Sequence, residues 1–138
     1  MNKPSGYALG SILQYLSHGV TIRITADYEV VRSYIHVRDL IEIAFSIMLG
    51  ITPGPGVPFD SAGDREIEIG ELALLAASVL GVHDVVIDRP AIDATKPRDR
   101  YVGDGRVIMD LAKAQRLTLV SLENQIHDTA NYLLAVKE

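Results

Sequence analysis

The sequence patterns that position a nicotinamide cofactor or activate a serine nucleophile are missing from this chain of 138 residues. A pyrophosphate is usually held by a glycine-rich turn between a strand and a helix. Here Gly54 and Gly56 lie in a proline-rich segment that follows a predicted helix. There is also no G-x-S-x-G elbow and no Walker-type loop. The sequence therefore predicts no cofactor-binding residues in this chain.

Two tyrosines come close to the Tyr-x-x-x-Lys pair, in which a lysine lowers the tyrosine pKa and holds a ribose. Tyr28 and Tyr34 are each followed, four residues later, by an arginine, Arg32 or Arg38. An arginine cannot serve as that lysine partner. We therefore predict no catalytic residue here, because a redox site cannot be built from this chain alone.

Metal-ligating side chains are present but scattered. No two of the histidines have the i, i+4 spacing of a helical metal site, and the carboxylates match no known ligand pattern. Cysteine is absent, which excludes disulfides, thiolate metal sites and a cysteine nucleophile. We predict no metal site. For His36, in a β-type run, a partly buried, hydrogen-bonded role is favoured over a ligand or catalytic base.

The helices that could position a site are indicated by apolar residues at three- and four-residue spacing. A first helix ends at Gly19, and a second, capped or charged by Asp39, runs to about Leu49 and ends at Gly50. The remaining helices are predicted over residues 71–80, over residues 106–116 and after a Ser121 cap.

Short strands separate these helices. Strand character is found at residues 20–24, 33–37, 57–61, 66–69 and 85–87, and residues 88–105 predict a long charged loop. The order predicts an α/β fold, yet with few strands and wide apolar helix faces. The strands at residues 33–37 and 57–61 would be exposed unless they joined a larger sheet, so we expect self-association through exposed apolar surface.

Composition excludes several kinds of partner. The chain has 48% apolar residues and a net charge of −5, and no run of Lys or Arg marks a nucleic-acid footprint. No apolar stretch is long enough to span a membrane, and the first residues do not have the pattern of a signal peptide. A single folded domain in the cytoplasm is the expectation.

One block carries a specific resemblance. Residues 19–40 read GVTIRITADYEVVRSYIHVRDL. This block is similar to the extended short-chain dehydrogenase/reductase family, whose nucleotide-sugar epimerases and dehydratases have a pattern like G-x-P-I-x-I-Y-G-D-G-x-Q-x-R-x-Y-I-H-V-x-D-L. Three further stretches follow in the family's order. Residues 59–73 resemble Y-N-V-G-S-x-x-x-I-S-I-x-E-L-A, residues 100–104 resemble R-Y-x-x-D, and residues 121–126 resemble S-L-E-E-G-I.

The resemblance implies a set of substrate-binding arginines. Arg32 would bind the diphosphate of a nucleoside-diphosphate sugar, as the planar guanidinium fork suits phosphate oxygens. Arg100 would close over the same diphosphate or the nucleoside, with Arg98 as its competitor. The alternative for each is an arginine wetted by solvent. Tyr28 and Tyr101 could stack on a base, but packing roles are favoured for both.

The sequence also departs from the family pattern. The G-D-G turn is replaced by Ala26-Asp27-Tyr28, which removes both glycines, and the N-V-G-S stretch by residues 60–63. Arg38 stands where the family has the first Asp of V-D-D. The turn near the substrate is therefore expected to differ, and the identity of the sugar and base cannot be carried over.

Two hypotheses follow from the resemblance. In the first, the chain is an incomplete Rossmann-type portion, the C-terminal, sugar-nucleotide-binding part of an NAD-dependent epimerase or dehydratase whose N-terminal NAD-binding half is absent. NAD would then be a cofactor of the complete enzyme and not of this chain. In the second, it is a stand-alone, non-catalytic binding or assembly module derived from that family.

Overall fold

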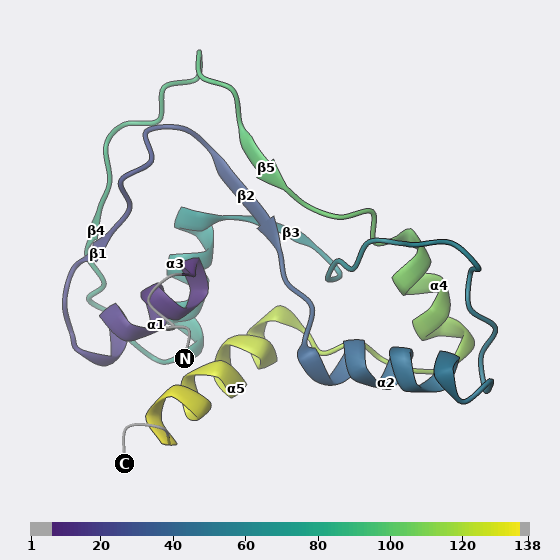
Figure 1. The fold of residues 1–138 in the computed structure, drawn as a ribbon. Helices are drawn as coiled ribbons and strands as arrows, with labels where there is room; N and C mark the ends of the chain where they lie inside the picture. Colours follow the sequence, from purple (N-terminus) through teal and green to yellow (C-terminus); the bar gives the residue numbers. More distant parts are fainter. Residues whose placement is uncertain (1–6, 136–138) are drawn as a thin grey trace. The chain divides into compact units, whose positions relative to one another are not determined.

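The computed structural model describes residues 7–135, which form five helices and five short strands (Figure 1). The first six residues, part of the stretch for which no signal peptide was expected, lie outside the described range. Two compact units are present. Among the described residues, unit 1 comprises those up to residue 32, residues 67–100 and those from residue 126 on, and unit 2 comprises residues 33–66 and 101–125. Over the described range, no helix has the length and apolar character needed to cross a membrane.

Unit 1 is built on a pair of helices and a pair of strands. Helix α1 (Ala8–Ser17) packs against α3 (Ile69–Val79). Strands β1 (Ile22–Arg23) and β4 (Ile87–Asp88) are parallel, with Ile22 opposite Ile87. Buried apolar side chains from α1, β1, α3 and the last helix form the core: Ile12, Leu13, Leu16, Ile22, Leu72, Ala73, Ala76, Ala77, Ile126 and Ala130.

Three further strands form a second sheet. They are β2 (Val30–Ser33), β3 (Glu66–Glu68) and β5 (Asp99–Tyr101), and their order is β3-β2-β5. Each of them contains a point at which the chain passes from one unit to the other. The helix α5 (Leu122–Ala135) contains the fourth such point.

Unit 2 is built on the helices α2 (Val37–Met48) and α4 (Arg106–Ala114). Its core is a cluster of four fully or nearly fully buried side chains, Ile43, Ile108, Leu111 and Ala112. Six partly buried apolar side chains pack against this cluster: Ile35, Ile47, Phe59, Val107, Leu117 and Leu119.

Two glycines allow loop segments of unit 2 to pass very close to one another. A Cβ added to Gly63 would lie 1.8 Å from the carbonyl oxygen of Tyr34, and one added to Gly103 would lie 2.8 Å from the carbonyl oxygen of Ser61. Such distances are far inside normal van der Waals contact, so backbone would have to shift to admit any side chain there. Both glycines belong to the stretches that resemble the epimerase family.

The ends of the helices are close to the sequence prediction. Gly19, Gly50 and Gly81 have φ angles of 63°, 68° and 68° and follow α1, α2 and α3. A left-handed residue just after a helix is the usual place for glycine, because it lacks a Cβ. At α5, the Ser121 hydroxyl accepts a hydrogen bond from the backbone N of Asn124 at 3.3 Å, which confirms the predicted cap.

Asp39 does not cap α2, but it lies in the first turn of the helix, which was the other alternative expected for it. The helix begins at Val37, and the imidazole Nδ1 of His36 accepts a hydrogen bond from the backbone N of Arg38 at 3.1 Å. Asp39 lies one turn too far along to cap the helix. Its side chain is fully buried instead, and it accepts a hydrogen bond from the backbone N of Val120 at 2.7 Å.

Two of the predicted strands also need correction. Strand β2 covers residues 30–33, so only the first residue of the expected strand at 33–37 is in it, and Val37 is helical. Residues 57–61 form no strand, since Pro58 lacks the N–H needed for a ladder and the segment runs as a loop past Gly103. Conversely, the expected loop at residues 88–105 contains β5.

Candidate functional site

Arg32, the first candidate for diphosphate binding, is half-buried on β2, and its guanidinium donates hydrogen bonds to three acceptor atoms. One terminal nitrogen, Nη1, donates to the carbonyl oxygens of Val31 at 2.9 Å and Asp99 at 2.8 Å. The other, Nη2, donates to Asp99 Oδ2 at 2.7 Å. The side chains of Arg32 and Asp99 remain 29% and 46% exposed. The planar fork is therefore fixed in direction, with Asp99 as its anionic partner.

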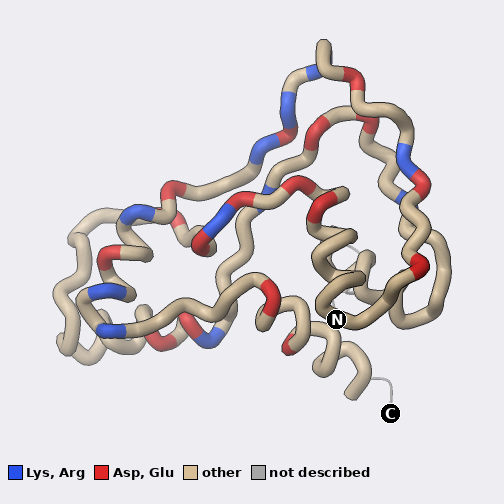
Figure 2. The backbone as a smooth tube through the Cα atoms, turned by 180° about the vertical axis from the view of Figure 1, so that it is seen from behind, with Lys and Arg blue, Asp and Glu red and all other residues tan. Residues whose placement is uncertain are grey.

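Two further ion pairs join the segment around β2 to the segment leading into β5. Lys96 pairs with Asp27, and Arg98 pairs with Glu29. Backbone hydrogen bonds run alongside them, from the N of Asp93 to the O of Asp27 at 2.7 Å and from the N of Asp99 to the O of Glu29 at 2.9 Å. Basic and acidic residues accordingly alternate along this part of the chain (Figure 2).

The other two candidate arginines lie in the same region of unit 1. Arg98 stands just before β5 and Arg100 within it, and both are exposed. Side chains alternate along a strand, so Arg98 and Arg100 lie on the face opposite to Asp99. Arg32 and Arg100 thus lie on the neighbouring strands β2 and β5, Arg98 lies just before β5, and the three side chains do not share one face. Tyr101 is 81% exposed and Tyr28 is half-buried.

A fourth arginine, which sequence reasoning missed, has the most buried ion pair in the described part of unit 1. Arg89 donates from Nη2 to Glu68 Oε1 at 2.8 Å and from Nη1 to Oε2 at 3.0 Å. The two side chains are only 12% and 17% exposed. Twenty-one residues separate them, and no motif spacing could have indicated the pair.

Arg89 also holds the turn in which both family glycines are replaced. Its Nε donates to the carbonyl oxygen of Ala26 at 3.2 Å, and its Nη2 to that of Tyr28 at 2.9 Å. In the described residues the one non-glycine residue with a positive φ is Arg116, so this turn needs no left-handed backbone. Side-chain donors thus stabilise the turn without glycine.

Glu68 is the acceptor at the centre of this arrangement. Besides Arg89, it accepts hydrogen bonds from the backbone N of Gly70 at 2.6 Å, where it caps α3, and of Val30 at 3.3 Å. Burial alone would raise the pKa of Glu68, but the hydrogen bonds from Arg89, Gly70 and Val30, with the Arg89 charge, bring that pKa below its usual value. The carboxylate is therefore held ionised.

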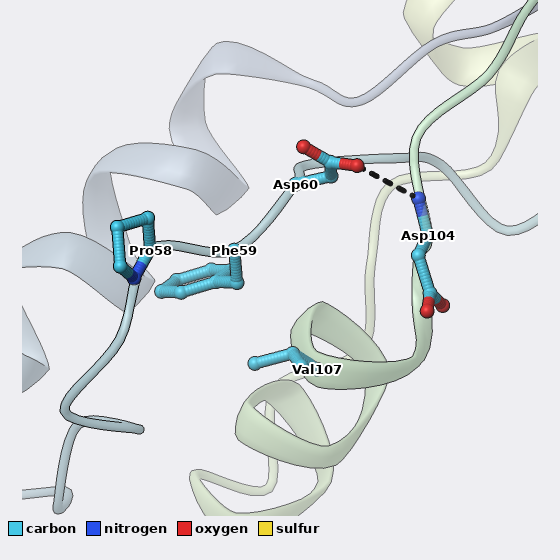
Figure 3. A pocket seen from close by; sticks show the side chains of 5 residues that line it. All are labelled: Pro58, Phe59, Asp60, Asp104 and Val107. Atoms are coloured by element: carbon cyan, nitrogen blue, oxygen red, sulfur yellow. Dashed lines mark hydrogen bonds between the residues drawn. The ribbon is translucent and has the colours of Figure 1, made fainter.

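Unit 2 contains an open pocket of about 320 Å³ that is apolar on one side and acidic on the other (Figure 3). Pro58, Phe59 and Val107 supply the apolar wall, and Asp60 and Asp104 the carboxylates. Hydrogen bonds from Arg106 lower the pKa of Asp104 to about 2, so this carboxylate stays negative at any physiological pH. Because Arg106 is paired with Asp104, Asp60 supplies the uncompensated negative charge of this lining.

The fold matches solved structures of enzymes that act on nucleotide sugars. The UDP-N-acetylglucosamine 4-epimerase of Methanobrevibacter ruminantium, solved with UDP-N-acetylmuramic acid, has a TM-score of 0.69 and 16% identity over 97% of this chain and 41% of its own. The UDP-glucose 4-epimerase of Thermotoga maritima, solved with UDP-glucose, has a TM-score of 0.66 and 21% identity over 99% of this chain and 42% of its own. The dTDP-glucose 4,6-dehydratase of Bacillus anthracis, solved with NAD, has a TM-score of 0.66 and 14% identity over 93% of this chain and 39% of its own.

This chain has the fold of part of a nucleotide-sugar epimerase or dehydratase. It spans about two-fifths of the length of these enzymes. The α/β class and the partial Rossmann-type architecture expected from the sequence are confirmed. No protein-family profile and no curated protein matches the sequence, so the likeness rests on the fold.

In this epimerase-like chain, the described glycines of positive φ lie outside any strand-to-helix turn. Its four glycines with positive φ are Gly19, Gly50 and Gly81, which follow helices, and Gly56, in the loop after α2. None lies at a strand-to-helix turn, where a pyrophosphate is cradled. Over residues 7–135 no three metal-ligating side chains gather either.

Proposed function

We propose that this chain binds the diphosphate of a nucleoside-diphosphate sugar, as the substrate-binding part of an NAD-dependent epimerase or dehydratase. The observation that carries the proposal is the fixed Arg32 fork on β2, in a fold shared with enzymes solved with UDP-glucose and UDP-N-acetylmuramic acid. The NAD that transfers hydride would belong to another part of the complete enzyme.

The chemistry of Arg32 fits this role. A guanidinium has five N–H donors, and the bonds to Val31 and Asp99 use at most three of them. The others can meet phosphate oxygens, with Asp99 keeping the plane of the fork in place. Charge-assisted, bidentate hydrogen bonds of this kind are stronger than neutral ones.

The cations around Arg32 are largely offset by neighbouring carboxylates. Arg32 pairs with Asp99, Lys96 with Asp27 and Arg98 with Glu29, and Asp93 adds a further negative charge to the same segment. Asp99 therefore competes with a diphosphate for Arg32, and its removal should strengthen binding.

Calorimetric titration of the purified chain tests the proposal. UDP-, dTDP-, GDP- and CDP-sugars are titrated separately, with NAD as the comparison. We expect one class of sugar nucleotide to bind, and NAD to show no saturable binding below the millimolar range. Tight NAD binding without any sugar-nucleotide binding, or epimerase activity in the pure chain, would overturn the proposal.

Substitution of Arg32 tests the residue assignment. Arg32→Ala should weaken sugar-nucleotide binding by about 2–3 kcal/mol, and Arg32→Lys should recover only part, since an ammonium cannot match the fork. Asp99→Asn should tighten binding, because a competing charge is lost. Arg23→Ala, at an exposed strand arginine, is the control. If Arg32→Ala lowers the melting temperature but leaves affinity unchanged, Arg32 is structural.

A further inference from the structure

Arg89 and Glu68 together hold one side of the chain that leads into β2. Arg89 donates to the carbonyl oxygens of Ala26 and Tyr28, and Glu68 accepts a hydrogen bond from the backbone N of Val30, the first residue of β2. These three backbone groups belong to every second residue. In a sheet, the backbone groups of alternate residues bind the same neighbouring strand. The ion pair therefore does for residues 26–30 what a neighbouring strand does in a sheet.

The intervening residues are held by the segment that leads into β5. The carbonyl oxygens of Asp27 and Glu29 accept hydrogen bonds from the backbone N of Asp93 and of Asp99. Asp99 is also the residue that fixes the Arg32 fork, through its carbonyl oxygen at 2.8 Å and its Oδ2 at 2.7 Å. A movement of residues 26–30 away from Arg89 would therefore shift β2 relative to Asp99 and change the direction of the fork.

The sheet alone gives β2 little support. Strand β2 has four residues, and its neighbours β3 and β5 have three each. Few ladder hydrogen bonds form over such lengths, and a sheet of this size needs further packing for stability. The pair of Arg89 and Glu68 is bidentate and largely buried, a geometry that holds both side chains rigidly. This pair therefore determines where β2 begins.

We propose that Arg89 and Glu68 are positioning residues for the Arg32 fork. Their ion pair fixes residues 26–30, these residues fix β2 against β5, and the fork thereby keeps the direction in which it would meet a diphosphate. All of these contacts lie within unit 1. The ligand side of this inference rests on the proposed function, whereas the mobility of the fork can be measured without a ligand.

Side-chain NMR of Arg32 tests the positioning without a ligand. Fixed acceptors at Nη1 and Nη2 slow the rotation of the guanidinium about its Nε–Cζ bond, so the hydrogens of the two nitrogens should give separate signals. Arg89→Lys keeps the charge but loses the fork geometry, so the Arg32 signals should merge in this variant. Leu16→Ala removes core volume from α1 and none of these contacts, and the signals should stay separate in this matched control.

Calorimetric titration with inorganic pyrophosphate tests the ligand side. Arg89→Lys should weaken binding about tenfold, which corresponds to one charge-assisted hydrogen bond. In an Arg32→Ala chain, the same change should weaken binding by less than about twofold, because Arg89 acts through Arg32 and the two effects are not additive. Leu16→Ala should leave the affinity of the folded chain unchanged.

Several outcomes would overturn the inference. Separate Arg32 signals in Arg89→Lys would refute the positioning, whatever the chain binds. Merged signals in Leu16→Ala as well would show that a general loss of stability frees the fork. A loss of about tenfold from Arg89→Lys both with and without Arg32 would show that Arg89 does not act through Arg32. Absence of pyrophosphate and sugar-nucleotide binding in the wild type would refute the proposed function alone, because the NMR comparison still decides the positioning.

Discussion

Removal of the Arg89 side chain should destabilise unit 1 more than removal of any of its exposed charged side chains. Arg89→Met keeps much of the aliphatic volume but leaves the Glu68 carboxylate without its two guanidinium donors. The change also removes the donors to the carbonyl oxygens of Ala26 and Tyr28. One partly buried charge and two backbone acceptors then lose their partners.

The structure sets the size of this effect. Breaking a fully buried ion pair by removing one partner costs about 3–5 kcal/mol. The side chains here are 12% and 17% exposed, so some water can reach the orphaned carboxylate. We expect Arg89→Met to lower the free energy of unfolding by about 2–3 kcal/mol. Glu68→Gln should cost about 1–2 kcal/mol, because the neutral amide oxygen can still accept from Gly70.

The cost of Glu68→Gln should depend on pH in a definite direction. Because the folded-state pKa of Glu68 is lowered, the carboxylate contributes stability above the usual pKa of a glutamate, about 4.3, and loses it as the pH falls through the lower folded value. Urea denaturation of wild type and Glu68→Gln at pH 7 and at pH 3 measures the difference. Equal costs at the two pH values, or a cost of Arg89→Met below about 0.5 kcal/mol, would refute this reasoning.

Three further predictions concern unit 2. Asp39→Ala should lower the free energy of unfolding by about 2 kcal/mol, since it leaves a buried backbone N–H unsatisfied, as urea titration would measure. Gly63→Ala should cost more than about 2 kcal/mol and Gly54→Ala little, because the added Cβ meets backbone at 1.8 Å in the first and a side-chain methyl at 2.9 Å in the second. Carboxyl NMR should find that Asp104 titrates with a pKa of about 2, and Arg106→Gln should raise that pKa toward the usual value.

Helix positions were predictable from sequence because their signals are local. Gly19 and Gly81 end α1 and α3 through their own backbone freedom, and Ser121 caps α5 through its own hydroxyl. Strands were less predictable, since a strand of two to four residues is defined by its partner. Nothing within residues 98–101 indicates pairing with β2, and only the fold brings those segments together.

The partners of buried polar side chains could not be predicted from the sequence, because they too are set by the fold. Glu68 stands where the family pattern has a serine, and it performs a similar capping function through its bond to Gly70. Its second function depends on Arg89, which is distant in sequence. A capping position can be inferred from its neighbours, but an ion pair across a fold requires coordinates.

The stretch that most resembles the family pattern explains the fold more directly than it explains the binding of a ligand. In residues 32–39, His36 caps α2, Asp39 fixes the backbone before α5, and the carbonyl of Tyr34 passes against Gly63. These are internal contacts that any chain with this architecture needs, whatever it binds. Arg32 and the more exposed Arg38 both keep guanidinium donors for an external group, and in Arg32 the fork is fixed in direction by Asp99. The proposed function therefore depends on Arg32. A comparison of Arg32→Ala with Asp99→Asn distinguishes a ligand-binding arginine from a structural ion pair. Opposite effects of the two changes on affinity indicate a ligand site, and parallel losses of stability indicate a structural pair.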